Sequence, residues 1–170
     1  MPSDFTVIQA VRQRFGEMHN DPAISEEEIK LEPEVLFVGA SKDYHFLCEN
    51  VDSKELGVLQ FETLGARAGS LEDSATTDPT ARNIVRINGT DIPGGITPGY
   101  APVFHNRRLP YWKAHTLLVP SNVLREQNVL HVESALQLFG HDNELDNFII
   151  DNVVVFFKTR KGRSDHPSIG

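Results

Sequence analysis

Three stretches of sequence decide the fold: NIVRING (residues 83–89), WKAHTLLVPSNVLREQNVLHVESA (residues 112–135) and DNFIIDNVVVFFKT (residues 146–159). In the first two, apolar residues alternate with polar ones, which is typical of strands with one buried face. The third is apolar on both faces, as expected for a central strand or one that carries a bulge. Turn residues separate the stretches: Asn88-Gly89, Pro120-Ser121-Asn122 and the polar residues 140–144. The pattern predicts antiparallel β-strands.

The same period of two begins earlier in the chain. Residues 35–38, 43–50 and 56–64 each have the pattern of a strand, and no internal repeat is present. Counting gives about seven or eight strands after residue 34, at spacings that suit two packed antiparallel sheets. The sequence therefore predicts an all-β sandwich over residues 34–159.

The first 33 residues are expected to form a helical or irregular extension. Asp4 can cap a helix over residues 4–19, and four apolar residues recur on one face of that helix at spacings of three and four: Ile8, Val11, Phe15 and Met18. The alternative is an N-terminal strand through Phe5, Val7 and Gln9. At the other end, residues 160–170 are expected to be a disordered basic tail.

Composition bounds the class of protein. The chain has 170 residues, of which 39% are hydrophobic and 24% charged, values typical of a globular domain. Its net charge of −8 argues against nucleic acid or an anionic membrane as partner, and no apolar run approaches the ~20 residues that cross a bilayer. The N-terminus lacks the features of a secretory signal, so a cytoplasmic location is the default expectation. The only cysteine, Cys48, excludes an intrachain disulfide and is expected in the core.

Two long connections stand out between the predicted strands. Residues 66–80 are rich in Gly, Ser, Asp and Thr, so a mobile surface loop is expected there. Residues 91–110 contain three Gly and four Pro, which excludes a sheet interior. Ordered loops of this length are often functional.

The order of these segments resembles the galactose-binding-like jelly roll. The resemblance covers roughly residues 33–158, and its matching pieces are Arg86-Ile87-Asn88-Gly89, Leu117-Leu118-Val119-Pro120, Leu124 with Gln127-Asn128-Val129-Leu130-His131-Val132, and Asp146-Asn147-Phe148-Ile149-Ile150-Asp151-Asn152-Val153-Val154-Val155. In this pattern the chain is similar to the sugar-binding domain beside the catalytic barrel of β-galactosidase-type enzymes, and to several carbohydrate-binding modules. The resemblance implies an antiparallel jelly-roll β-sandwich. Fold analogy carries no function by itself.

One loop combines the side chains that proteins use to bind sugars: Tyr100, His105, Asn106, Arg107, Arg108, Tyr111 and Trp112. An aromatic ring stacks on the C–H face of a sugar, while planar polar groups bond its hydroxyls. We expect Trp112 or Tyr111 to supply the ring. The competing interpretation is that Trp112 begins a core strand and Tyr111 covers the sandwich edge, with the two arginines in solvent.

The resemblance also implies a structural calcium site. In several jelly-roll modules, an acidic residue in the last strand, at a position like Asp151, helps to hold such an ion, and Asp146 lies nearby in the sequence. Calcium takes six to eight oxygen ligands, and no EF-hand-like spacing supports it here. The alternative is that these are turn residues, with Asp151 exposed or capping a bulge.

No motif for catalysis or transition-metal binding is present in the sequence. The histidines form no H-x-H or H-x-x-x-H pair, no G-x-S-x-G elbow occurs, and no lysine follows Gly94-Gly95 as a phosphate loop requires. We therefore expect a non-catalytic binding module whose ligand is a carbohydrate, bound through loops at one end of the sandwich. The alternative is a structural or assembly module that uses the same loop to contact itself or another protein.

Overall fold

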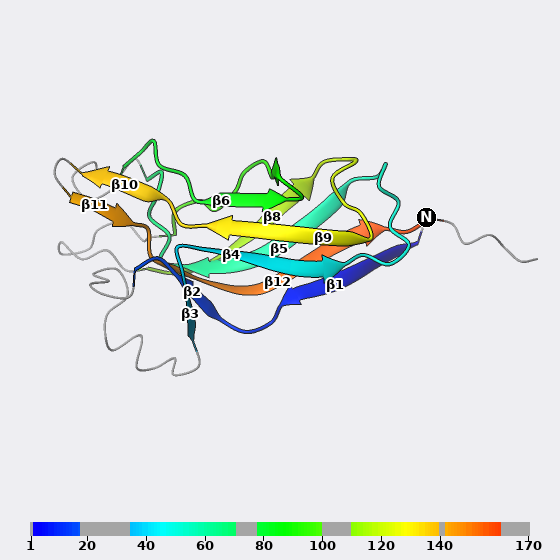
Figure 1. Ribbon diagram of the computed structural model, residues 1–170, viewed down its shortest axis with the longest axis horizontal. Coiled ribbons are helices and arrows are strands. Elements are labelled where there is room, and N and C mark those ends of the chain that lie inside the picture. Colours follow the sequence, from blue (N-terminus) through cyan, green and yellow to red (C-terminus); the bar gives the residue numbers. More distant parts are fainter. Residues whose placement is uncertain (1, 18–34, 71–77, 100–109, 140–141, 161–170) are drawn as a thin grey trace, which may run out of the picture.

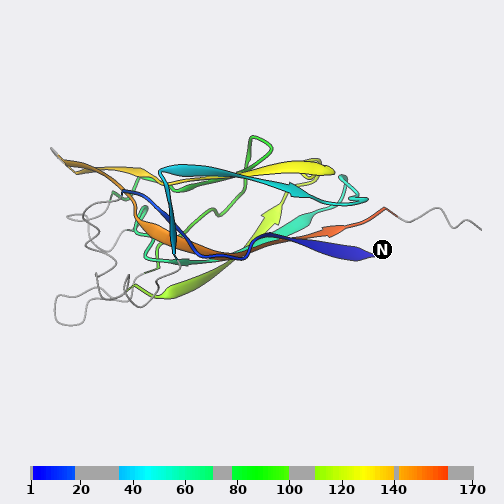
Figure 2. The ribbon, with the colours of Figure 1, turned by 60° about the horizontal axis from the view of Figure 1, so that its bottom comes forward.

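The computed structural model describes residues 2–17, 35–70, 78–99, 110–139 and 142–160 (Figure 1). These ranges contain twelve strands and no helix, and therefore no helix that could span a membrane. The strands form two facing sheets, and a small hairpin projects at one end (Figure 2). The all-β class predicted from the alternation of apolar and polar residues is confirmed.

The larger sheet has six strands in the order β3-β2-β12-β5-β8, with β1 also paired to β12. Its members are β1 (Ser3–Gln9), β2 (Gln13–Phe15), β3 (Leu36–Gly39), β5 (Gly57–Leu64), β8 (Trp112–Val119) and β12 (Phe148–Lys158). All pairs are antiparallel except β2 with β3.

The smaller sheet runs in the order β4-β9-β6-β7 and faces the larger one (Figure 2). Its members are β4 (Ser41–Leu47), β6 (Ile84–Ile87), β7 (Thr90–Asp91) and β9 (Gln127–Glu133). Asn88 and Gly89 connect β6 to β7 with φ angles of 51° and 80°, so the predicted tight turn is confirmed. The separate hairpin consists of β10 (Leu136–Phe139) and β11 (Asp142–Leu145).

One apolar core lies between the two sheets. Side chains at alternate positions point into it, so that Phe61 of β5, Ile87 of β6 and Leu130 of β9 belong to a single buried cluster. Cys48 is fully buried in this cluster, which confirms its expected place.

The N-terminal segment is not a helix. β1 runs antiparallel along β12 with Ser3 opposite Lys158, and β2 continues along the same edge with Phe15 opposite Phe148. The helical or irregular extension is therefore wrong for residues 3–15, and the strand alternative is right. The physical reason is that β12 offers an unpaired edge, and its pairing with β2 buries the Phe15 ring in a stack on Phe148 with 5.1 Å between centroids. Residues 18–33 and the tail 161–170 lie outside the described residues.

β12 occupies the middle of the larger sheet, as its two apolar faces predict. A bulge shifts its register with β5 between Asp151 and Val154. Asn152 has a φ of 52° in this bulge, a conformation that Asn adopts more readily than most residues.

Candidate functional site

Trp112 and Tyr111 lie exposed at one end of the larger sheet. Trp112 begins β8 on the outer face, opposite Leu64 of β5, which in turn lies opposite Ile149 of β12. Trp112 is 37% exposed and Tyr111 43%. Each of these two neighbouring aromatic residues has accessible surface for contact with a ligand.

Arg12 joins Trp112 to the last strand. Its Nε donates a hydrogen bond of 2.9 Å to Asp151 Oδ2, and its guanidinium carbon lies 4.8 Å from the centre of the Trp112 ring. The Asp151 side chain is largely buried and that of Arg12 is one-third exposed. A guanidinium over an indole is a cation–π contact of about 0.5–1 kcal/mol at exposed sites, and it fixes the orientation of the ring.

Polar groups continue from Asp151 across the neighbouring strands. Asn152 Nδ2 donates to Glu62 Oε2 at 2.8 Å, and Gln60 Nε2 donates to Thr116 Oγ1 at 3.4 Å. These exposed amide, carboxylate and hydroxyl groups are of the kinds that bind sugar hydroxyls.

The base of the predicted sugar-binding loop is tied to the same end of the sheet. Gly99 N donates to Ala66 O at 3.0 Å, and Tyr111 N donates to Gly99 O at 3.1 Å. Lys113 Nζ donates to Pro98 O at 3.0 Å. The other predicted residues of this loop lie outside the described residues: Tyr100, His105, Asn106, Arg107 and Arg108.

Asp146, a predicted calcium ligand, is a buried hydrogen-bond acceptor. Its carboxylate accepts the backbone N–H groups of Arg67 and Ala68 and the Asn83 amide at 2.7–3.1 Å. Burial raises the pKa of Asp146, and these donors together with the Arg67 charge oppose the rise. Asn83 Oδ1 also accepts Ala135 N at 2.8 Å, so this buried group connects three separate segments.

These hydrogen bonds correct the expected position of the loop at residues 66–80. Ala66, Arg67 and Ala68 are buried, not on the surface, because Asp146 holds the backbone of this segment inside the molecule. Polar composition alone gave no signal of that distant acceptor. Residues 71–77 lie outside the described residues.

The two predicted calcium ligands contact different partners. Asp151 pairs with Arg12 on the outer face, whereas Asp146 binds buried N–H groups. Among the described residues, no group of three or more His, Cys, Asp and Glu side chains is arranged to hold a metal ion. Calcium binding stays a prediction.

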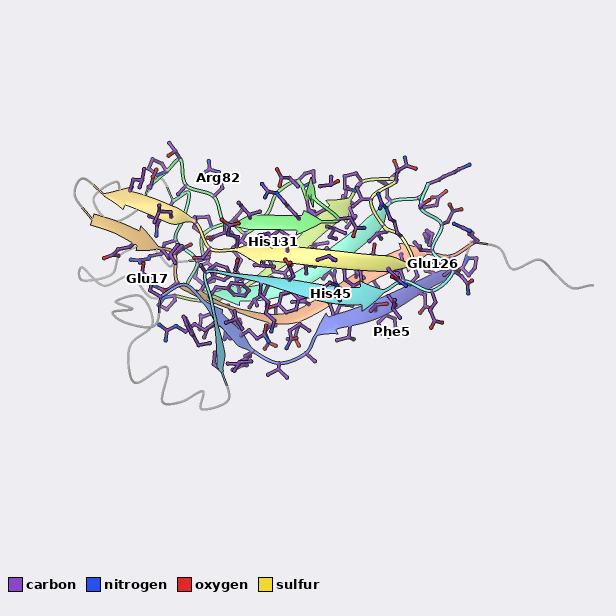
Figure 3. The ribbon with its side chains drawn as sticks, viewed as in Figure 1. Phe5, Glu17, His45, Arg82, Glu126 and His131 are labelled. Carbon is purple, nitrogen blue, oxygen red and sulfur yellow. The ribbon has the colours of Figure 1, made fainter. Side chains whose placement is uncertain are left out.

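His131 lies on β9 in the smaller sheet (Figure 3). On the outer face of that sheet it stands between two carboxylates. His131 Nδ1 lies 2.6 Å from Asp43 Oδ1, and its Nε2 lies 3.1 Å from Glu133 Oε2. Both hydrogen bonds raise the pKa of His131. Arg86 pairs with Asp91 nearby and borders a shallow pocket of about 300 Å³. With both ring nitrogens engaged, His131 is not positioned as a free base.

An apolar row crosses the far end of the larger sheet on its outer face. Strand register aligns its four members: Phe5 of β1, Phe156 of β12, Val58 of β5 and Leu118 of β8. Phe5 is 58% exposed and Leu118 60%. An antiparallel sheet that faces water normally carries polar residues on that side, so this row is a candidate contact surface.

No protein-family model matches the chain, and no curated protein is detectably similar to it in sequence.

Proposed function

We propose that this protein is a non-catalytic binding module with a jelly-roll fold whose ligand is a carbohydrate, bound at the loop end of the sandwich. The observation that carries the proposal is the exposed pair Tyr111 and Trp112 beside polar side chains from β5 and β12. A sugar ring stacks on the indole or phenol, and its hydroxyls bond neighbouring amides and carboxylates.

The ion pair of Arg12 and Asp151 supports this role by preparing the site. Arg12 holds one face of the Trp112 ring, so the ring loses little rotational freedom when a ligand arrives. The proposal extends to His105, Asn106, Arg107 and Arg108 as hydroxyl ligands from the adjoining loop.

Glycan-array screening, with and without calcium, tests the proposal, followed by titration of the best glycan into variants. Trp112→Ala is expected to weaken binding by about five- to thirtyfold, because stacking on one aromatic ring contributes on the order of 1–2 kcal/mol. Leu138→Ala, a similar truncation of an exposed residue in the hairpin, should bind normally. Undiminished binding by Trp112→Ala would remove this residue from the site, and the absence of glycan binding by the wild-type protein would refute the function.

A second candidate function is assembly, and the apolar row favours it. Four apolar side chains in register make a surface that a second copy or another protein can cover. In this alternative the protein is a structural module, and the row is its contact surface.

A further inference from the structure

Three buried nitrogen donors near the hairpin have no hydrogen-bond partner among the described residues: Arg67 Nε, Arg67 Nη2 and Gln137 Nε2. The Arg67 side chain is 10% exposed and Gln137 is fully buried. Folded proteins pair about 90% or more of such groups, because an unpaired buried donor loses its hydrogen bonds to water and gains none. Three of them in one region indicate that an acceptor belongs there.

The strand that carries Gln137 has an inverted pattern. In β10, Leu136 and Leu138 are more than half exposed, whereas the glutamine between them points inward. An alternating strand normally buries its leucines and exposes its amide. Burying the amide and exposing two leucines costs free energy, and nothing in the fold alone explains that cost. Such local conflicts are typical of functional positions.

The segments that carry Arg67 and Gln137 are joined through two hydrogen-bonding residues, Asp78 and Asp146. Asp78 links their segments, since its N–H donates to Gln137 Oε1 at 3.5 Å and its carbonyl accepts Gly69 N at 3.1 Å. Asp146 provides a second link, since its Oδ1 lies 4.0 Å from Arg67 Nε and its backbone N donates to Ala135, two residues before Gln137.

The charge of this region restricts the acceptor to a neutral oxygen. Asp146 already offsets the Arg67 guanidinium, but its carboxylate is occupied by the Arg67, Ala68 and Asn83 donors and stays beyond hydrogen-bond distance of Arg67 Nε. A second anion would place two carboxylates beside one buried cation, which is unfavourable at low dielectric. A hydroxyl oxygen accepts the open N–H groups and adds no charge.

We propose that Arg67 and Gln137 form a subsite for hydroxyl oxygens of a neutral sugar, and that this subsite excludes sugars bearing a carboxylate. The inference depends on the carbohydrate-binding function proposed above, and it specifies the ligand class. The location suits it, because the hydrogen bonds from Tyr111 to Gly99 and from Gly99 to Ala66 connect the aromatic pair directly to the Arg67 segment.

A ligand must open the segment to reach these covered donors. Opening breaks the hydrogen bonds from Arg67 N and Ala68 N to Asp146 and from Gly69 N to Asp78 O. Gly65 and Gly69, with φ angles of 87° and 83°, give the backbone conformational freedom on both sides of Arg67. Binding is therefore slow compared with simple surface stacking.

Gln137→Leu tests whether the amide lacks an acceptor in the free protein. Leucine has a similar volume and removes the unpaired Nε2 donor. It also removes the Oε1 acceptor, but the bond that this atom accepts from Asp78 N is long, at 3.5 Å, and only partly buried, so the urea midpoint is expected to stay equal or rise. Gln13→Leu is the matched control: Gln13 is also buried, but it accepts the hydroxyl of Tyr44, and its replacement should lower the midpoint. A fall of the midpoint in Gln137→Leu would show that the amide is already satisfied and would overturn the inference.

Calorimetric titration with methyl β-galactoside, methyl β-glucoside and the two corresponding uronates tests the ligand class. The wild-type protein should bind a neutral glycoside about tenfold or more tightly than its uronate, and Gln137→Leu and Arg67→Lys should lose about tenfold in affinity for it. Equal binding by these variants, while Trp112→Ala fails to bind, would refute the subsite and leave the proposed function standing. Tighter binding of a uronate would refute the neutral-oxygen argument. No binding of any of the four would refute the subsite, whereas the proposed function is decided separately by the glycan array.

Discussion

His115 is a buried base whose protonation opposes folding. It lies in the core with its Nε2 2.9 Å from Thr63 Oγ1 and its ring stacked on Phe61, and burial, aided by the Lys113 charge, lowers its pKa to about 4. The unfolded chain, with a histidine pKa of about 6.5, then binds more protons than the folded protein between those two values. The free energy of unfolding should be unaffected by His115 above pH 6.5 and should fall as the pH drops towards 4.

Urea denaturation at pH 7 and pH 4.5 measures this effect. The wild-type protein is expected to lose roughly 2–3 kcal/mol more between the two pH values than His115→Leu, which has no group to protonate at this position. Equal losses in the two proteins would show that His115 titrates normally in the folded state.

At the level of single residues, the sequence predicts side-chain direction where local alternation sets it, but not the pairing of residues that are far apart in the chain. The outward direction of His131 and Glu133 and the burial of Cys48 follow from local alternation, which needs no knowledge of distant segments. The pairing of Arg12 with Asp151 spans 139 positions and carries no local signal. Gln137 lies between two leucines in the sequence, a pattern that marks a strand. Alternation alone then predicts that the leucines are buried and that the Gln137 amide points to solvent, which is the reverse of the structure.

Two substitutions can distinguish the strands β1 and β2 from the helix that the sequence predicts for the same residues. A helix would place Val11 and Phe15 on one buried face, but the structure leaves Val11 exposed between the two strands and buries Phe15 completely. Phe15→Ala is expected to lower the free energy of unfolding by about 3–5 kcal/mol, and Val11→Ala by less than about 0.5 kcal/mol. Comparable losses from both, measured by chemical denaturation, would contradict the strand assignment.

The strand segments themselves were largely predictable, but their pairing was not. Period-two alternation located β5, β6, β8, β9 and β12 because each buries one face or both. In the N-terminal segment, the spacing of the apolar residues resembles that of a helix. The reason is that residues 10–12 lie between β1 and β2, so the alternation of β1 does not continue in phase to Phe15. The β10–β11 hairpin was missed, since its leucines point outward and give it no amphipathic signature.

The apolar row predicts self-association of the whole molecule if assembly is its function. Light scattering of the wild-type protein should then show a mass above that of the monomer at high concentration, because the row supplies apolar area that a second copy can bury. Leu118→Lys should restore the monomer. Leu138→Lys is the matched control, since Leu138 is equally exposed but lies on the hairpin, outside the row. A monomeric wild-type protein at high concentration would exclude self-association through this surface.

The overall architecture depends on contacts that no local pattern encodes. Composition and alternation predicted two packed sheets, and the facing arrangement of β4-β9-β6-β7 against the larger sheet agrees with that. The strand order did not follow from the sequence, because it is set by pairings such as that of β1 with β12, between segments about 150 residues apart. Local propensity cannot distinguish one such pairing from another.

The central position of β12 has a consequence for biosynthesis. β12 follows every other described strand in the chain, yet β1, β2 and β5 all hydrogen-bond to it. While the ribosome is still translating residues 148–158, these earlier strands have emerged without their common partner and expose open edges to other nascent chains. The larger sheet can therefore close only late in translation, and a chain arrested before β12 cannot complete its fold.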